Sequence, residues 1–459
     1  MVFKPRPCRI PTLNPHTMAP SRCTTTCPAC GLRTRTDATS GPAPRSSLGA
    51  AAAPPQAPRR VLVLAILSML MAFASISTDL YLPALPAMGH ALHAGVGTIE
   101  YTITGYLIGF SIGQLFWGPV ADRYGRRRPV ALGLVLFILG SVGCAMSLSA
   151  ATMTAWRVVQ AIGACASVVL ARAMVRDLYE GPRAARMLST LITVMAIAPL
   201  VGPSVGGLIL RLASWRWIFW TLAGVGLLTL AALQRLPETL PRQRRSSEPF
   251  HLAFRHYGAL LKDRRLLAYA GAGGFFYGGV YAYIAGTPFA FIADYHVSPQ
   301  RYGLLFAAGI LGLMLTNQIN GRLVGRLGSD RLLHAGANGA ALAALWLAVD
   351  AWTGWGGLTG LALPLFLFVS ANGFIVANSL VGALGSFAQH AGAVSALVGC
   401  IQYGCGILGS ALVGLFADGT PWPMGWVIAL FSLGTLLCVR RLRPAPSPSN
   451  RSSAAPMSL

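Results

Sequence analysis

Charged residues are scarce in this chain of 459 residues, and most carry the same sign. Only 11% of the residues are charged, and 36 basic residues outnumber 13 acidic ones. Lysine occurs only at Lys4 and Lys262, and neither completes a Gly-x-x-x-x-Gly-Lys-Ser/Thr loop, which excludes the phosphate-binding motif of ATP-driven pumps. The sequence also has no His-x-x-x-His pair, and no nucleophile can be matched with a base. We therefore expect neither an ATPase nor an enzyme.

Cysteine is also sparse, and its nine copies form two groups. One group lies near the N-terminus and the other within apolar runs: Cys8, Cys23, Cys27 and Cys30, then Cys144, Cys165, Cys400, Cys405 and Cys438. Cys23, Cys27 and Cys30 are spaced almost like a zinc knuckle, but no His or Cys partner follows at the finger distance. Cysteines in membrane segments usually pack as small apolar residues. We therefore expect no metal and no cofactor.

Apolar residues, in contrast, dominate the sequence. They make up 54% of it, and the mean hydropathy is +0.59, which indicates a polytopic membrane protein. A net charge of +23 would suggest a nucleic-acid partner in a soluble protein. Here, however, the arginines cluster between apolar runs, as topology signals do. We therefore expect a protein of the lipid bilayer with no nucleic-acid partner.

The order of apolar and polar stretches predicts the domain organisation. Residues 1–58 are rich in Pro, Ser, Thr, Ala and Arg and lack a signal-like apolar run, so we expect a disordered cytoplasmic tail there. Twelve segments long enough to cross a bilayer follow: 61–82, 99–119, 129–148, 151–172, 187–210, 216–234, 266–286, 302–323, 332–350, 358–380, 393–416 and 424–440. The fold class is therefore an all-α membrane protein with twelve transmembrane helices in two pseudo-symmetric six-helix bundles. The expected bounds are 59–235 and 266–443, with a cytoplasmic linker at 236–265 and a disordered tail at 444–459.

Arginine placement predicts the orientation. Loops after the second, fourth, sixth and eighth segments and the C-terminal end are rich in arginine, whereas the opposite side offers only Arg211, Arg216 and Arg301. By the positive-inside rule, both termini are cytoplasmic. We expect a multi-pass protein of the cell inner membrane, and nothing in the sequence demands more than a monomer.

One polar turn stands out between the second and third segments. Gly118-Pro-Val-Ala-Asp-Arg-Tyr-Gly-Arg-Arg-Arg128 joins two apolar runs, and Asn320–Gly328 repeats it in weaker form at the matching place in the second half. A duplicated set of six helices is what alternating access requires. A basic stop-transfer loop is the alternative interpretation. We expect a gate built from Gly118, Asp122, Arg123, Gly125, Arg126 and Arg127, in which Asp122 approaches the helix N-terminus near residues 391–393 when the cytoplasmic side closes.

This turn resembles the signature loop of the major facilitator superfamily. Other stretches resemble its bicyclomycin-resistance (Bcr/CflA) drug-efflux branch: Thr78-Asp-Leu-Tyr-Leu-Pro-Ala-Leu-Pro86, Arg157-Val-Val-Gln-Ala-Ile-Gly163, Arg172-Ala-Met-Val-Arg-Asp-Leu-Tyr179, Gly202-Pro-Ser-Val-Gly-Gly207 and Trp215-Arg-Trp-Ile-Phe219. The resemblance runs from about Val61 to Arg443. It implies antiport of drugs against protons, with Arg157 in proton coupling and a seal against leak at Gly202, Pro203, Gly206 and Gly207. Tight helix packing explains the same glycines equally well.

Two acids and one arginine are the candidates for proton coupling. At about 1.5 Å per residue Asp79 lies roughly 27 Å along the first segment, so we expect it in the outer half of a cavity, where it exchanges a proton for substrate. Glu100 stands where the branch usually places a glutamine, which leaves open which acid carries the proton. Arg157 needs a counter-charge, and Asp79, Glu100, or helix carbonyls with Gln160 are the alternatives. The competing interpretations are a helix-end cap for Asp79 and a snorkelling arginine.

Polar and aromatic groups in the second half are candidates for binding a small molecule. Aromatic walls with few polar groups suit amphipathic compounds. Interhelical hydrogen bonds are the alternative for most such residues. Tyr277, Asn372 and Gln402 are our candidates for contact with substrate.

These observations together favour a proton-coupled efflux transporter that exports amphipathic small molecules such as antibiotics. Its partners are the substrate, protons and lipid. A proton-coupled symporter that imports a metabolite is the alternative with the same fold, and a membrane scaffold or sensor without transport is the alternative from another class.

Overall fold

The computed structural model describes residues 57–442, except for 180, 246–257, 386 and 388–390. All described residues fall within one compact unit. The predicted disordered tails at 1–58 and 444–459 lie outside the described residues apart from 57 and 58, and the linker at 236–265 is described only in part.

The described chain is helical, and no strand occurs within it. Its long helices and short helical segments are α1 (Ala57–Asp79), η1 (Leu82–Ala84), α2 (Leu85–Ala91), α3 (Val96–Tyr124), α4 (Arg127–Ala145), α5 (Ala150–Leu178), α6 (Gly181–Leu212), α7 (Arg216–Leu233), η2 (Arg242–Arg244), α9 (Arg264–Pro288), the π-helical η3 (Phe289–Asp294), α10 (Pro299–Leu327), α11 (Ser329–Thr353), α12 (Gly357–Ser370), α13 (Asn372–Leu384), α14 (Ala391–Leu415) and α15 (Trp422–Arg440).

Each of the twelve predicted segments falls on these helices, which confirms the all-α membrane fold. Within the described residues, 11 spans are long and apolar enough to cross a membrane. The twelfth is α3, which has 29 residues but is rich in glycine, threonine and tyrosine. Its mean hydropathy is therefore too low to identify α3 as a membrane span, although its length is sufficient to cross a bilayer.

Two predicted segments differ from the structure. The first was expected to continue to residue 82, but α1 ends at Asp79 and the span continues through η1 and α2, where Pro83 and Pro86 fall at the beginnings of these short helices. The tenth was expected to be unbroken but is interrupted at Ala371, between α12 and α13. The Thr316 hydroxyl of α10 donates to the Ser370 carbonyl oxygen at 2.5 Å, and such an inserted side chain bends a helix.

The sequence repeat is also a structural repeat. Gly125 ends α3 with φ +88° and Gly328 ends α10 with φ +82°, a left-handed conformation that favours glycine. Packing follows the same symmetry. The α4 helix contacts α7 as α11 contacts α15, and α1 contacts α6 as α9 contacts α14.

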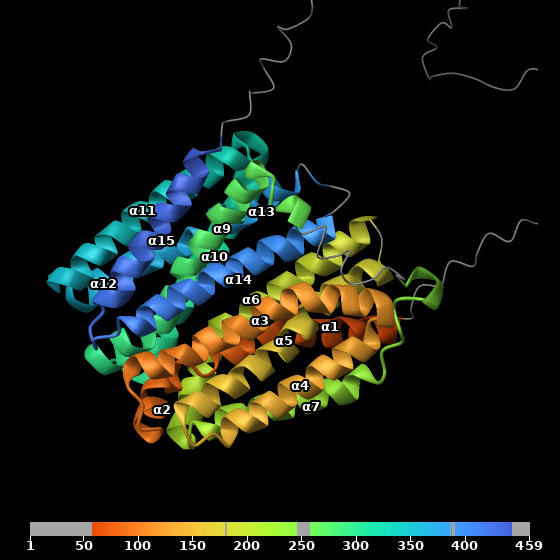
Figure 1. Ribbon diagram of the computed structural model, residues 1–459, viewed down its shortest axis with the longest axis horizontal. Coiled ribbons are helices and arrows are strands. Elements are labelled where there is room, and N and C mark those ends of the chain that lie inside the picture. The colour runs from red at the N-terminus through yellow and green to blue at the C-terminus, as the bar shows by residue number, and fades with distance from the viewer. Residues whose placement is uncertain (1–56, 180, 246–257, 386, 388–390, 443–459) are drawn as a thin grey trace, which may run out of the picture. The chain divides into compact units, whose positions relative to one another are not determined.

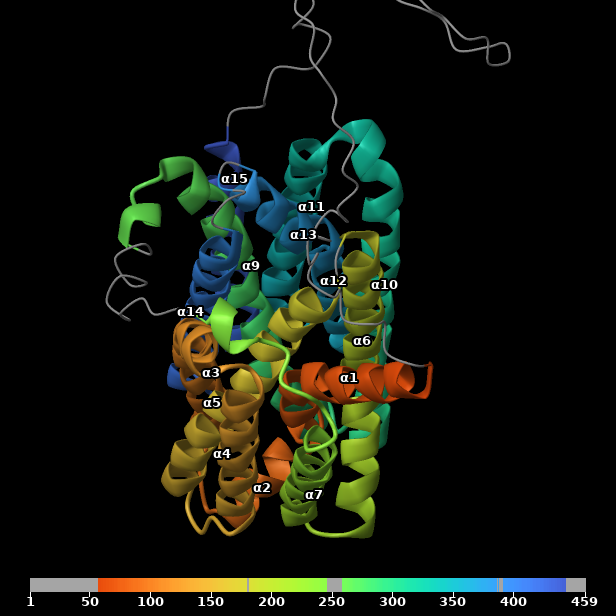
Figure 2. The same ribbon diagram turned by 90° about the vertical axis from the view of Figure 1, so that its right-hand side faces the viewer.

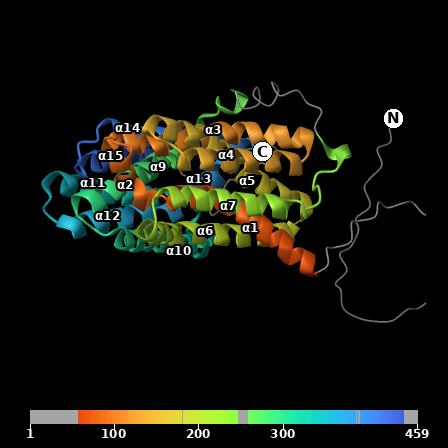
Figure 3. The same cartoon turned by 90° about the horizontal axis from the view of Figure 1, so that it is seen from below.

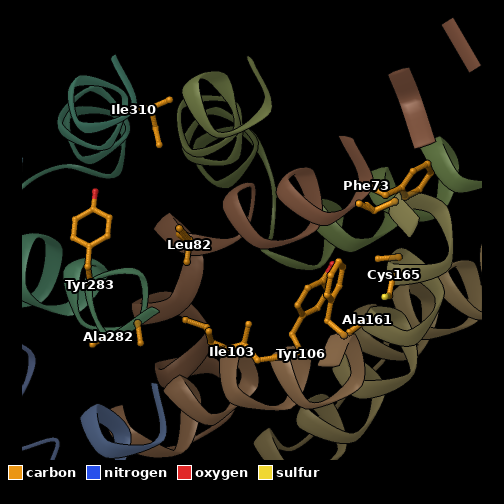
Figure 4. Close-up of a cluster of buried hydrophobic side chains, with 14 of the residues drawn as sticks. Phe73, Leu82, Ile103, Tyr106, Ala161, Cys165, Ala282, Tyr283 and Ile310 are labelled. Carbon is orange, nitrogen blue, oxygen red and sulfur yellow. The ribbon is translucent and has the colours of Figure 1, made fainter. Parts of the chain in front are cut away.

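The two halves meet along two helix pairs. In Figure 1, α1 to α7 lie together in red to yellow-green and α9 to α15 in green to blue. The α3 helix packs on α14, and α6 packs on α10, as the symmetry between halves requires. Figure 2 shows α6 beside α10, and Figure 3 shows that most helices of both halves lie with their axes roughly along one line, whereas α1 begins obliquely to them. Apolar side chains from both halves, among them Ile103 and Tyr283, gather near Leu82 in Figure 4.

The halves are packed tightly at one end. At the end that carries α2, called here the α2 end, a Cβ on Gly97 would lie 2.0 Å from the Gly414 carbonyl oxygen. Contact between α3 and α14 continues to Gln114 beside Gly399. At the opposite end, called here the arginine end, a Cβ on Gly118 would meet no atom within 4 Å. The structure is therefore closed at the α2 end.

Candidate functional site

Arg157 of α5 is fully buried at the meeting point of three helices. Its Nη1 donates to the Ser77 carbonyl oxygen of α1 at 2.9 Å and to Gln160 Oε1 at 2.6 Å. Its guanidinium carbon lies 4.2 Å from the Tyr81 ring centre and 4.3 Å from that of Tyr106. The cation is thus held between two aromatic faces, an arrangement that stabilises a desolvated guanidinium.

This environment decides between the alternatives left open by the sequence. Among the described residues no ion pair joins Arg157 to an acid, so neither Asp79 nor Glu100 neutralises it directly. Instead, a helix carbonyl and Gln160 accept hydrogen bonds from its Nη1, and the two ring faces stabilise the charge while Nε and Nη2 have no hydrogen-bond partners. Because Arg157 is 0% exposed, the snorkelling interpretation is wrong.

Asp79 is the last residue of α1 and is 5% exposed. Thr78 Oγ1 donates to its Oδ1 at 3.3 Å, and no described cation lies within ion-pair distance. The membrane span continues from Val61 to Ala91, so Asp79 lies a little beyond its midpoint, deeper than the position that the predicted segment gave. Its burial also argues against a solvated helix-end cap.

The predicted glycine motif lies directly against Asp79. A Cβ on Gly202 would lie 3.0 Å from Asp79 Cβ, and one on Gly206 would lie 1.8 Å from the Leu80 carbonyl oxygen. Gly207 faces the other half, since its Cβ would lie 3.1 Å from the Pro299 carbonyl oxygen of α10. The motif thus joins the end of α1 to α6 and the second half in one close junction.

Pro203 of this motif is buried in α6 and does not break the helix. Ser204, which follows it, stands in a Gly-x-Ser-x-Gly sequence, the letter pattern of a hydrolase nucleophile elbow. That elbow requires a strand-to-helix turn, whereas Ser204 lies inside a continuous helix and packs against Gly303 of α10. Ser204 is therefore a packing residue within α6.

Glu100 lies in a different place, where the halves close at the α2 end. It is 2% exposed, and its Oε2 has no hydrogen-bond partner in the described part of the chain. It borders a cavity of about 20 Å³ with residues of α9, α14, α15 and the loop between the last two: Gly286, Val413, Ala417, Pro423 and Met424. Glu100 and Asp79 are therefore not a pair, and Glu100 belongs to the contact between halves.

The predicted gate centres on Arg126. Its Nη1 donates to Asp122 Oδ1 of α3 at 2.6 Å, and its Nε donates to Asp177 Oδ2 of α5 at 2.9 Å. Asp122 remains 52% exposed, Arg123 is exposed on the same turn, and Arg127 Nη2 donates to the Gln234 carbonyl oxygen at 3.0 Å. The turn therefore links α3, α4, α5 and the end of α7.

Sequence analysis missed two acids of this network, Asp177 and Glu238. Glu238 follows α7 and accepts from the backbone N–H groups of Arg126 and Arg127, at 2.7 and 3.2 Å, where α4 begins. Partial burial raises the pKa of Glu238, but hydrogen bonds from three backbone N–H groups and the nearby Arg245 outweigh it, so that pKa lies below its usual value. The signal was available, because Glu238 is the first acid after the sixth segment and is followed by an arginine-rich stretch.

We expect Glu238→Gln to destabilise the protein by about 1 kcal/mol at neutral pH, since a carboxylate at a helix N-terminus is worth roughly that much. A folded-state pKa below the unfolded value gives stabilisation that is present above the unfolded pKa and is lost as pH falls through the folded pKa. The difference in melting temperature between wild type and Glu238→Gln, measured in detergent, should shrink on acidification. A difference that grows in acid would contradict the assignment.

In the second half, hydrogen bonds between neutral side chains hold the equivalent turn, and Tyr269 also donates to Asp330 Oδ1 at 2.7 Å. Ser329 Oγ donates to Asn378 Oδ1 at 2.9 Å, and Asn378 Nδ2 donates to Asn320 Oδ1 at 2.7 Å. Gly325 stands where the first half has Asp122. Among the described residues, the ion pair between Asp122 and Arg126 is therefore not repeated in the second half.

Of the three predicted substrate contacts, Tyr277 lies in an aromatic cluster between the halves. Tyr277 and Tyr281 of α9 and Tyr403 of α14 have ring centres about 6 Å apart, and Phe110 of α3 lies 4.5 Å from Tyr403. We call these four residues the aromatic cluster. Gln402 is buried against α9, where a Cβ on Gly273 would lie 3.1 Å from its Nε2.

Asn372, the third predicted contact, lies on a different helix from Tyr277 and Gln402. It is half-buried at the start of α13, directly after the helix break, and forms no hydrogen bond with Tyr277 or Gln402. Tyr281, Tyr403 and Phe110 were not among the predicted contacts. The sequence signal for them is aromatic residues within apolar runs, which does not distinguish an inter-half face from an ordinary core.

Known proteins resemble this chain over most of its length. The model of the Major Facilitator Superfamily matches residues 66–410. An uncharacterized MFS-type transporter, YdgK of Bacillus subtilis, is 35% identical and is aligned over 82% of this chain and 93% of its own. The bicyclomycin resistance protein homolog of Haemophilus influenzae is 30% identical, and the alignment covers 83% of this chain and 93% of the relative. The chloramphenicol resistance protein of Pseudomonas aeruginosa is 31% identical, and the alignment covers 82% of this chain and 90% of the relative.

Solved structures show the same fold. The xylose transporter XylE from E. coli, in a partially occluded inward open conformation, matches with a TM-score of 0.66 at 15% identity, covering 84% of this chain and 98% of that one. At this identity the likeness supports the fold alone. With the family model, the relatives and the paired six-helix architecture in agreement, the chain belongs to the major facilitator superfamily, in its drug-efflux branch.

Proposed function

We propose that the chain is a proton-driven exporter of amphipathic small molecules that works by alternating access. The observation that carries this proposal is the junction at Asp79. A buried carboxyl without a counter-ion lies where the end of α1 meets the glycine motif of α6, and the same motif contacts α10 of the other half. Protonation at that point acts on the packing between halves. The relatives named for resistance to bicyclomycin and chloramphenicol support export of drug-like molecules.

The proposed cycle exchanges protons for substrate. An ionised carboxyl at Asp79 is costly in a buried site, so it needs water or a proton. Substrate binds at the aromatic cluster, with Gln402 and Asn372 as polar contacts, while the arginine end is open. One charge that moves across 100 mV supplies about 2.3 kcal/mol, enough for a roughly fiftyfold gradient.

The last step of the proposed cycle is closure of the gate at the arginine end. In the present form Asp122 is bound to Arg126. When that end closes, Asp122 moves to the N-terminus of α14, whose helix dipole favours a carboxylate. Arg126 stays bound to Asp177, so the turn remains anchored to α5 while Asp122 changes partner.

Orientation and assembly complete the proposal. We place the arginine end in the cytoplasm, because arginines concentrate there, and both termini on the same side of the inner membrane. Residues 59–235 and 266–443 act as the two moving bodies, joined by the linker at 236–265. A single chain supplies both halves of the pathway, so the protein functions as a monomer.

Everted membrane vesicles with an acidified lumen test the proposal. In such vesicles the cytoplasmic face points outward, so addition of an exported compound should release protons from the lumen and accumulate the compound inside. Chloramphenicol is a suitable uncharged probe. A symporter would carry compound and protons in the same direction, and an inactive scaffold would give neither flux, so either result would overturn the proposal.

A further inference from the structure

Glu100 of α3 is a buried acid to which the proposed transport cycle gives no role. It is 2% exposed, its Oε2 has no hydrogen-bond partner among the described residues, and no described cation lies within ion-pair distance. The cavity beside it has a volume of about 20 Å³, which is room for a single water molecule. An unpaired carboxylate is strongly disfavoured in such a site, whereas a neutral carboxyl is not. In the closed form Glu100 therefore holds a proton.

Glu100 also lies inside the contact that closes the α2 end. A Cβ on Gly414 of α14 would lie 3.5 Å from Glu100 Cβ and 3.2 Å from a ring carbon of Tyr101. One turn further along α3, the hydroxyls of Thr104 and Ser410 lie 2.9 Å apart and join the two halves by a hydrogen bond. We call this contact between α3 and α14 the outer gate. The gate cannot open unless α3 separates from α14, and that separation exposes Glu100 to water.

No neighbouring charge can take the place of water around Glu100. The other residues that line the cavity are not titratable. At the α2 end, the titratable and charged groups of the elements around α3 are Tyr101 on α3 itself, His90 and His93 around α2, Arg157 on α5, Tyr283 on α9, Asp294 in η3 and Asp418 after α14. None of them lines the cavity. Arg157 is stacked between two tyrosine rings, and Asp418 accepts from the Thr420 N–H and hydroxyl at 2.9 and 2.7 Å. The charge of Glu100 therefore depends on its access to water.

We propose that Glu100 controls the outer gate through its proton: it is protonated while the gate is closed and ionised when the gate opens. This inference rests on the proposed function, in which the α2 end faces outward, and adds control of that gate by the external pH. Glu100 meets water only when the α2 end opens, so the proton that it releases and the proton that it regains belong to the same side of the membrane. Unlike Asp79, it carries no proton across.

Proton linkage gives the direction of the effect. The closed form binds one proton more than the open form, so acid outside favours closure and alkali favours opening. For a single proton, the ratio of open to closed molecules changes by at most about tenfold per pH unit. Glutamine is neutral at every pH, so Glu100→Gln should keep the gate closed without this dependence on pH.

Spin labels on the two sides of the outer gate measure this equilibrium. Thr98 lies in the first turn of α3 and Leu415 ends α14, and both are exposed. Nitroxides on Thr98→Cys and Leu415→Cys, in a protein whose nine native cysteines are replaced by alanine, report the distance by double electron–electron resonance in nanodiscs. The share of molecules with the long distance should rise with pH more steeply in the protein with Glu100 than in Glu100→Gln, by up to about tenfold per pH unit. Asp79 is present in both proteins, so its own titration cancels in this comparison.

Infrared difference spectra give a second readout without labels or cysteine variants. At neutral pH the C=O absorption of a protonated carboxyl should be present in wild type and missing from Glu100→Gln. Asp418→Asn is the matched control for both measurements, because Asp418 is an exposed acid in the loop directly after α14. Its replacement should leave the pH response of the gate and this absorption as in wild type.

Three results would overturn the assignment and leave the export function standing, provided that chloramphenicol export is retained. These are equal pH responses with and without Glu100, a gate that is more open in Glu100→Gln at neutral pH, and identical infrared spectra for the two proteins. A pH response that depends on Glu100 in a protein without proton-driven export would contradict the export function instead, and the proton dependence of the gate would stand.

Discussion

Asp79→Asn should abolish proton-driven export and still allow substrate to bind. The asparagine side chain has nearly the same size as aspartate, so the contact with Gly202 and the end of α1 can be retained. It cannot gain or lose a proton, however. In everted vesicles we expect the compound-induced proton release to fall to the level of vesicles without the protein. Substrate affinity in detergent, measured by tryptophan fluorescence, should change by less than about threefold, because Asp79 lies outside the aromatic cluster.

Asp350→Asn provides the matched control for this prediction. Asp350 is another buried carboxyl, 4% exposed, near the end of α11 in the other half, and it accepts from the backbone N–H of Gly356 in the following loop at 2.7 Å. Its role is local capping, so its replacement should lower stability and leave proton release per protein unchanged. Loss of proton release in both variants would mean that any buried acid is required for folding, which would remove the case for Asp79.

Glu100→Gln decides which of the two predicted acids carries the proton. Glutamine is the residue that the resembling branch usually has at this position, and Glu100 borders a small cavity where the halves close. We expect coupled transport to persist in this variant. If Glu100→Gln lost proton release and Asp79→Asn retained it, the assignment would be reversed.

Sequence reasoning predicted the architecture well because its signals are strong and local. Bilayer-length apolar runs and arginine-rich turns predict the number of helices, and the repeated glycine at 125 and 328 predicts the same turn in both halves. The helix breaks at Asp79 and Ala371 were not predicted. The second depends on a hydroxyl from another helix, Thr316, and no local pattern reports such a contact.

The candidate site was predicted in its residue types and not in its pairings. Asp79, Glu100 and Arg157 were found because ionisable residues are rare in membrane segments. Their separation was not predictable, because it depends on rotation and depth of three helices. The aromatic partners of Arg157 were equally hidden, since Tyr81 and Tyr106 look like ordinary apolar positions in the sequence.

Arg157→Lys should cause a loss of transport comparable to that of Asp79→Asn, together with a loss of stability. Arg157 donates to the Ser77 carbonyl oxygen, two residues before Asp79, and so holds the last turn of α1 in place against α5. A lysine keeps the charge but cannot stack a planar group between Tyr81 and Tyr106 while it reaches both Ser77 and Gln160. Loss of a desolvated cation–π contact corresponds to about 2 kcal/mol, visible as a lower melting temperature in detergent.

Arg216→Lys is the control that separates the effect of the position of Arg157 from the general effect of replacing a stacked arginine by lysine. Arg216 also stacks on an aromatic ring, with its guanidinium carbon 4.4 Å from the Trp215 ring centre, and donates to the Ser147 carbonyl oxygen at 3.3 Å, but it lies at the beginning of α7. Its replacement should lower the melting temperature only slightly and leave compound-induced proton release unchanged. If Arg157→Lys kept normal proton release per molecule transported, Arg157 would be a packing residue. If it bound substrate normally but released protons without transporting substrate, the contact with Ser77 would be the link that makes the Asp79 proton depend on substrate.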